Sequence, residues 1–134
     1  MKALTIWQPW ASLIAWGAKQ YETRSWATAH RGPLAIHASL SDATVHLIPQ
    51  NSFYVQAFER AGKSWEEALP AGVVLCTVDL VDVVRVETLR GKLSQAEENF
   101  GDYSAGRFAW RLDNVRLIER PILVRGQQGV WEWR

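Results

Sequence analysis

Three charged residues, Lys19, Glu22 and Arg24, lie close together in the stretch GAKQYETR. A lysine that loses water against aromatic side chains is driven toward its neutral form, whereas a nearby carboxylate favours its charged form. If the fold placed Lys19 in such a surrounding, its amine could accept a proton or bind a phosphate or carbonyl oxygen. The planar fork of Arg24 suits either Glu22 or a phosphate. The spacing alone also fits a surface ion-pair cluster, worth about 0–1 kcal/mol.

The elements around these charges decide where they point. The pattern predicts an opening strand, two helical turns that begin at Pro9 and end at Gly17, and a short second strand. Proline is tolerated at the first helical position, and glycine commonly ends a helix. Alternation along the second strand sends Glu22 and Arg24 to one side and Thr23 to the other. The charged stretch is therefore expected to leave the helix directly into an edge of the sheet.

Tryptophan is unusually frequent, with eight copies in 134 residues. Most of them are expected in the core, because an indole ring carries a large apolar area. Trp7, Trp10 and Trp26 lie next to the charged stretch. They are candidates for a wall on which a base stacks, an interaction worth about 1–3 kcal/mol per base.

The rest of the chain predicts strands with short helices. Residues 41–69 contain helical pieces and are interpreted as an insertion between strands. From Gly72 the apolar positions alternate as far as Leu80 and then change parity, which indicates a bulge or bend in a long strand. One or two strands follow over residues 107–124, and a last one covers GVWEWR. About six strands and two to four short helices without a βαβ rhythm predict an α+β fold, a single domain over residues 1–134 built as a small mixed β-barrel.

Composition restricts the function classes. The net charge of +1 gives no bulk attraction to nucleic acid or membranes, although residues 106–134 carry six arginines against three acidic side chains. The single cysteine, Cys76, lies in an apolar run and is expected in the core of a protein from a reducing compartment. No segment approaches the roughly 20 apolar residues of a membrane span, so we expect a soluble cytoplasmic protein. One cysteine, three histidines and no nucleotide-binding or nucleophile motif predict no metal and no cofactor.

The stretch from the opening strand to the charged residues resembles the signature of the ASCH domain (activating signal cointegrator homology), a family of the PUA-like superfamily of small β-barrels. The family pattern is an apolar strand, QPxA, a helix, GxKxxExR, and a strand ending near IHAS. Its positions in this chain are Gln8, Pro9, Ala11, Gly17, Lys19, Glu22, Arg24 and residues 36–39. Residues 97–101 and 106–110 also look like later elements of the family. The resemblance covers nearly the whole chain except residues 41–69.

The resemblance implies a PUA-like barrel with a cleft between the barrel and the first helix, and recognition of RNA or a modified nucleoside there. Some members of the family deacetylate N4-acetylcytidine and others cleave RNA, and the fold does not decide between these activities. In the deacetylating members the corresponding motif resembles KxxT, with threonine as nucleophile and lysine as its base. Here Glu22 occupies the threonine position and Thr23 is expected to face away from Lys19. A carboxylate could still activate water, so hydrolysis is weakened and not excluded.

These residues give one leading hypothesis and two alternatives. The leading hypothesis is a module that binds RNA, single-stranded nucleic acid or a modified nucleoside, with Lys19, Arg24 and Arg107 meeting phosphates. The other residues expected to contact the ligand are Trp7, Gln8, Pro9, Trp10, Trp26, Ser39 and Tyr103. The first alternative is a hydrolase of N4-acetylcytidine or a ribonuclease, with Lys19, Glu22 and Glu98 as acid and base. The second is a protein-interaction domain, for which an exposed apolar patch away from Lys19 would be the sign.

Overall fold

The computed structural model describes residues 1–134 and contains six strands, three α-helices and two 3-10 helices. The strands are β1 (Lys2–Ile6), β2 (Tyr21–Arg24), β3 (Gly32–Ala38), β4 (Val73–Arg85), β5 (Phe108–Leu123) and β6 (Val130–Glu132). The helices are α1 (Trp10–Ala15), α2 (Ser52–Arg60) and α3 (Gln95–Asn99), and the 3-10 helices are η1 (Val45–Gln50) and η2 (Val86–Leu89). None of the helices has the length and apolar character that crossing a bilayer requires.

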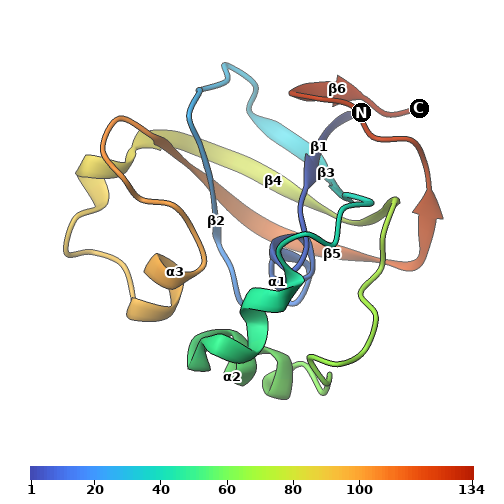
Figure 1. The fold of residues 1–134 in the computed structure, drawn as a ribbon. Helices are drawn as coiled ribbons and strands as arrows, with labels where there is room; N and C mark the ends of the chain where they lie inside the picture. The colour runs from blue at the N-terminus through green and yellow to red at the C-terminus, as the bar shows by residue number, and fades with distance from the viewer.

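The six strands form one curled sheet in the order β2-β5-β4-β3-β1-β6 (Figure 1). β1 and β3 run parallel, and every other neighbouring pair is antiparallel. The long strands β4 and β5 shift register three times, the last time between Leu80 and Asp82. This shift falls where the apolar alternation of the sequence changes parity, so the predicted bend is confirmed. The predicted α+β fold of about six strands with short helices is confirmed as well.

The main core lies between one face of the sheet and α1. Trp110 is fully buried there, packs edge-on against Trp26 with ring centroids 5.0 Å apart, and donates from Nε1 to the Trp26 carbonyl. Cys76 belongs to the same core, and burial raises the pKa of its thiol to about 12. The expectation of core tryptophans is confirmed for Trp110 and Trp131, whereas Trp7 is exposed.

Helix α1 is short because neighbouring residues determine both of its ends. The Gln8 side chain accepts a hydrogen bond from the Ser12 amide at 3.0 Å and donates to the Pro70 carbonyl at 2.9 Å. These bonds close the first turn and connect it to the segment before β4. Gly17, at φ 78°, takes the left-handed conformation that ends the helix, as predicted. The chain then passes from α1 directly into the charged stretch and β2.

Residues 41–69 contain η1 and α2, which lie at one side of the barrel (Figure 1). Asn51 caps α2 with its side-chain oxygen, which accepts from a backbone amide at 2.9 Å. Tyr54 and Phe58 of α2 pack with Phe100 in a second buried cluster. The predicted helical character of this segment is confirmed, and its description as an insertion in a single domain stays a prediction. The packing brings Tyr54 close to the residues that follow α3.

The segment after β5 is connected to the sheet by hydrogen bonds around His37. His37 Nε2 lies 2.7 Å from the Val124 carbonyl, and Nδ1 lies 3.1 Å from the Thr5 hydroxyl. A carbonyl only accepts, so in neutral His37 the Nε2 atom carries the proton and Nδ1 accepts from Thr5. Trp131 Nε1 donates to the same hydroxyl at 3.1 Å. Gly126 passes so close that a Cβ atom there would lie 2.7 Å from His37 Cε1 and from Thr5 Oγ1.

We expect Gly126→Ala to lower the free energy of unfolding by about 1–3 kcal/mol, because the added methyl group overlaps atoms that these hydrogen bonds hold in place. Gln128→Ala, at an exposed position of the same segment, is the matched control, with an expected change within about 0.5 kcal/mol. Urea unfolding followed by tryptophan fluorescence measures both variants. Equal stability of the two would mean that the segment moves freely away from His37.

Candidate functional site

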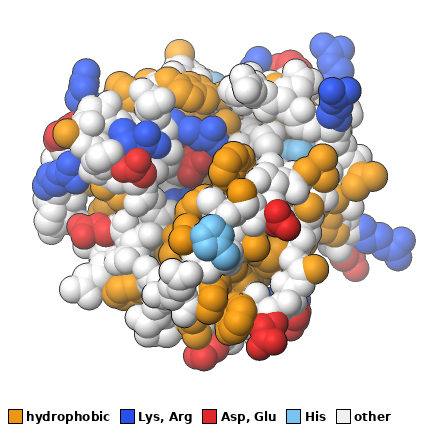
Figure 2. Space-filling model, viewed as in Figure 1, with side chains coloured by type: hydrophobic (Ala, Val, Ile, Leu, Met, Phe, Trp, Pro, Cys, Tyr) orange, Lys and Arg blue, Asp and Glu red, His pale blue; other side chains and the backbone are white.

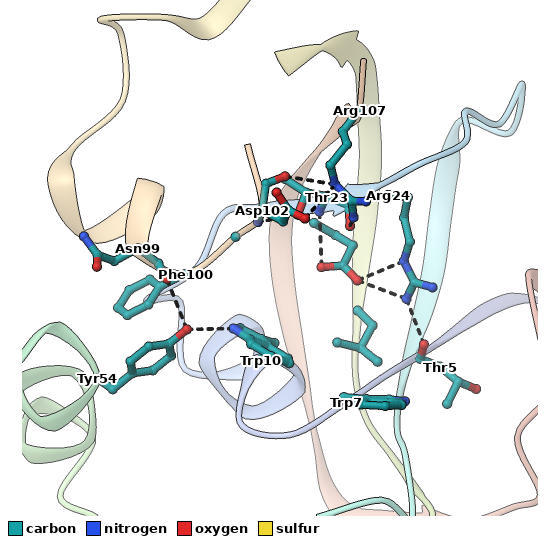
Figure 3. A pocket seen from close by; sticks show the side chains of 13 residues that line it. Thr5, Trp7, Trp10, Thr23, Arg24, Tyr54, Asn99, Phe100, Asp102 and Arg107 are labelled. Carbon is teal, nitrogen blue, oxygen red and sulfur yellow. Dashed lines mark hydrogen bonds and ion pairs between the residues drawn. The ribbon is translucent and has the colours of Figure 1, made fainter. Parts of the chain in front are cut away.

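A cavity of about 410 Å³ opens where β1 ends and the chain enters α1 (Figure 3). Its walls come from β1 and β2, from α1 and α2, and from the loop that follows α3. Trp7 and Trp10 contribute two indole rings, and Arg24 and Arg107 contribute two guanidinium groups. Segments that are distant in the sequence therefore converge beside the charged stretch.

Lys19 lies behind this cavity and is not part of its lining. Its side chain is buried, and Nζ donates a hydrogen bond to the Phe100 carbonyl at 2.6 Å. Glu22 Oε1 is 4.0 Å from the same nitrogen. The loss of water lowers the pKa of Lys19, while the charges of Glu22 and Glu97 act in the opposite direction. The amine is thus bonded to the backbone of the loop after α3.

Glu22 and Arg24 form an ion pair on one side of β2, as the alternation predicts. Arg24 Nε donates to Glu22 Oε2 at 3.0 Å, and Glu22 Oε1 accepts from the Thr23 amide at 3.2 Å. Arg24 Nη2 also donates to the Thr5 carbonyl at 2.9 Å. Because β2 and β1 are not neighbours in the sheet, this arginine connects two strands that share no backbone hydrogen bonds. The ion pair and the bond to Thr5 are both visible in Figure 3.

The acidic residue that α3 turns toward Lys19 is Glu97. Glu98, the residue expected from the sequence, is exposed on α3 and is not among the residues that line the cavity. Glu97 is buried, its Oε1 accepts from the Gln20 amide at 2.8 Å, and burial raises the pKa of its carboxyl group. The sequence contained a signal for this: Glu97 precedes the apolar Phe100 by three positions, which places both on one helical face.

Aromatic side chains form much of the cavity wall. Trp7 is 49% exposed, whereas Trp10 is partly buried and donates from Nε1 to the Tyr54 hydroxyl at 2.9 Å. Tyr54 in turn donates to the Asn99 carbonyl at 3.1 Å, and burial raises its pKa. Sequence reasoning missed Tyr54, because it lies in residues 41–69 and no local pattern connects that segment to α1. Trp26 stays outside the lining and packs on the core.

Arg107 and Asp102 form the side of the cavity near β5. Arg107 Nη2 donates to the Thr23 carbonyl at 3.3 Å, and Nε donates to the Asp102 carbonyl at 3.1 Å. The Asp102 carboxylate lies 3.5 Å from Arg107 Nε. Thr23 belongs to the lining too, and its Oγ1 accepts from the Asp102 amide at 3.0 Å. The loop after α3 is therefore attached to β2 by side-chain and backbone contacts.

Besides Lys19 and Trp26, four residues expected to contact a ligand lie outside the cavity lining. Gln8 is buried and bonded to Ser12 and Pro70, and Pro9 is buried at the start of α1. Ser39 lines a neighbouring cavity. The Tyr103 hydroxyl is buried without a hydrogen-bond partner, and burial raises its pKa. The cavity therefore contains Trp7, Trp10, Glu22, Arg24 and Arg107 from the expected set.

We expect the free energy of unfolding of the wild type to rise relative to that of Lys19→Met as the pH rises toward 10.5, the ordinary pKa of lysine. The pKa of Lys19 is lower in the folded protein than in the unfolded chain. Between these two pKa values the unfolded chain binds more protons, so the free energy of unfolding rises with pH. The gain amounts to about 1.4 kcal/mol for each unit by which the pKa is lowered. Urea unfolding at several pH values above about 8 measures the difference between the two proteins.

Lys63→Met is the matched control, because Lys63 is exposed and the same comparison is expected to be flat. A flat difference for Lys19→Met would mean that burial leaves the pKa of Lys19 unchanged. If the free energy of unfolding of the wild type falls relative to that of Lys19→Met as the pH rises, the charges of Glu22 and Glu97 raise the pKa of Lys19 by more than the loss of water lowers it.

Comparison with protein families matches residues 4–122 to the ASCH domain. The proteins named Activating signal cointegrator 1 of Homo sapiens and Mus musculus are each 32% identical over 136 aligned residues. The alignment covers 96% of this chain and 22% of each relative, so the chain spans about a fifth of the length of these curated proteins.

Solved structures show the same fold. The ASCH protein of Zymomonas mobilis matches with a TM-score of 0.60 at 17% sequence identity, over 99% of this chain and 87% of that one. A single-residue variant of the same protein matches with a TM-score of 0.59. The match over residues 4–122 places this chain in the ASCH domain family.

Proposed function

We propose that the cavity beside α1 binds one base of a single-stranded RNA or the base of a modified nucleoside. Membership of the ASCH family supports an interaction with nucleic acid. The observation that carries the proposal is the position of Trp7, a residue that is 49% exposed and lines the cavity. A half-exposed tryptophan beside a cavity offers apolar surface on which a base can stack.

The charge balance of the cavity favours an uncharged, planar group. Arg24 is paired with Glu22, and Arg107 is paired with Asp102, so the lining carries no net charge. In the space-filling view of Figure 2, positively and negatively charged side chains are interspersed at the upper left of the molecule. The volume of about 410 Å³ lies in the range of about 300–1,000 Å³ that is typical of small-molecule sites. A base has a flat apolar face and polar edges, which suits indole walls beside hydrogen-bonding groups.

The hydrolase and ribonuclease alternatives receive less support. A general base must reach the proton that it removes, within about 2.6–3.2 Å or through one water. Lys19 is directed at the Phe100 carbonyl, outside the lining. Glu22 belongs to the lining, but its two carboxylate oxygens accept hydrogen bonds from Arg24 and from the Thr23 amide. These contacts favour a binding role for the cavity.

A protein-interaction role would use an apolar surface elsewhere. Leu117 and Leu123 of β5 are 68% and 81% exposed, which is the kind of feature such a role requires. Nothing in the fold indicates what would cover them. The nucleic-acid proposal therefore remains the better supported one.

We expect Trp7→Ala to weaken binding of a fluorescein-labelled, mixed-sequence RNA octanucleotide by about 5- to 150-fold, the loss of one stacked base. Trp65→Ala is the matched control, because Trp65 is 44% exposed and does not line the cavity. Fluorescence anisotropy at low salt measures both affinities, and a thermal melt confirms that both variants are folded.

Equal affinities of the two variants would contradict the stacking role of Trp7. An octanucleotide that does not bind the wild type, together with nucleosides that do not raise its melting temperature, would overturn the proposed function.

A further inference from the structure

A second cavity, of about 350 Å³, opens beside the first. It lies among the ends of β1 and β3, the residue before β4, and the segment after β5. Thr5 belongs to both walls: its carbonyl accepts from Arg24 at the first cavity, and its side chain bonds His37 at the second. In Figure 3 the Thr5 side chain points away from the first cavity. Only the width of β1 therefore separates the two cavities.

The second cavity has a different electrostatic character. None of its ten lining residues is acidic. Arg125 is exposed in its wall and forms no ion pair, in contrast to Arg24 and Arg107 of the first cavity. Gln127 and Gln128 lie beside it with exposed amide groups. The site therefore offers one free cation and several neutral donors to an anion.

The backbone that carries Arg125 is held on both sides. The Val124 amide donates to the Gly72 carbonyl at 3.1 Å, and the Val124 carbonyl accepts from His37 at 2.7 Å. Gly126 lies so close to the His37 ring that no side chain fits there. Arg125 is thus presented from an ordered segment, which lowers the entropy cost of binding.

We propose that the second cavity is a phosphate subsite, so that the ligand is a dinucleotide or a longer strand and not a free nucleoside. This inference rests on the proposed function of the first cavity. The uncharged first cavity takes a base, the backbone passes round the end of β1, and the neighbouring phosphate contacts Arg125. Thr5 connects the two subsites, because its carbonyl and its hydroxyl take part in opposite walls.

The test compares Arg125→Ala with Arg120→Ala, an exposed arginine of β5 that lines neither cavity. Both variants are titrated with the labelled RNA octanucleotide at several salt concentrations, and nucleosides and dinucleoside monophosphates compete for binding. Arg125→Ala is expected to weaken octanucleotide binding about 10-fold and to reduce the slope of log K against log salt by about 0.7. Arg120→Ala is expected to match the wild type. On the wild type, dinucleoside monophosphates are expected to displace the labelled octanucleotide better than nucleosides do. On Arg125→Ala, the two kinds of competitor are expected to displace it equally well.

The outcomes separate this inference from the proposed function. If Arg125→Ala binds like the wild type while Trp7→Ala binds weakly, the phosphate subsite is wrong and the base cavity stands. If Arg120→Ala loses as much affinity as Arg125→Ala, the effect is one of general surface charge and the subsite is again wrong. If no octanucleotide or nucleoside binds the wild type, both proposals fail.

Discussion

The hydrogen bond between the Lys19 amine and the Phe100 carbonyl joins two parts of the chain that are 81 residues apart. A buried ammonium group is stable only with hydrogen-bond acceptors and counter-charges, and here Glu22 and Glu97 supply the charges. Glu22 also binds Arg24, and Arg24 binds the Thr5 carbonyl of β1. A line of polar contacts therefore runs from the loop after α3, through β2, to β1. It positions the edge strand β2 opposite a strand with which it shares no backbone hydrogen bonds.

The same contacts decide the electrostatics of the first cavity. Its two arginines are engaged by Glu22 and Asp102, so the walls are polar without net charge. Removing the acidic partner of either arginine would turn a neutral cavity into a cationic one. The second cavity, on the other side of β1, differs in charge, because its lining contains Arg125 and no acidic residue. The proposed binding of a nucleic-acid strand, with its uncharged bases and charged phosphates, rests on this difference between the two cavities.

The tryptophans show how one residue type serves different purposes according to its neighbours. Trp110 is enclosed by the curled sheet and satisfies its indole N–H with the Trp26 carbonyl. The indole N–H of Trp10 donates to the Tyr54 hydroxyl, which fixes the ring in the cavity wall. Trp7 lies directly after β1, and about half of the residue remains exposed to water. Of the aromatic residues in the cavity, it is the one with the most free surface for a ligand.

The sequence by itself determined the local features: the end of α1 at Gly17, the shared side of Glu22 and Arg24, and the bend of β4 at the change of parity. Periodicity and glycine conformation depend on residues within a few positions, so these signals are readable along the chain. Only the tertiary structure decided that Lys19 bonds the Phe100 backbone, that Glu97 and not Glu98 faces it, and that Tyr54 joins the wall. Each of these contacts joins residues 44 or more positions apart, or depends on which helical face is buried. Such contacts depend on how the sheet curls and packs, and no local pattern records that.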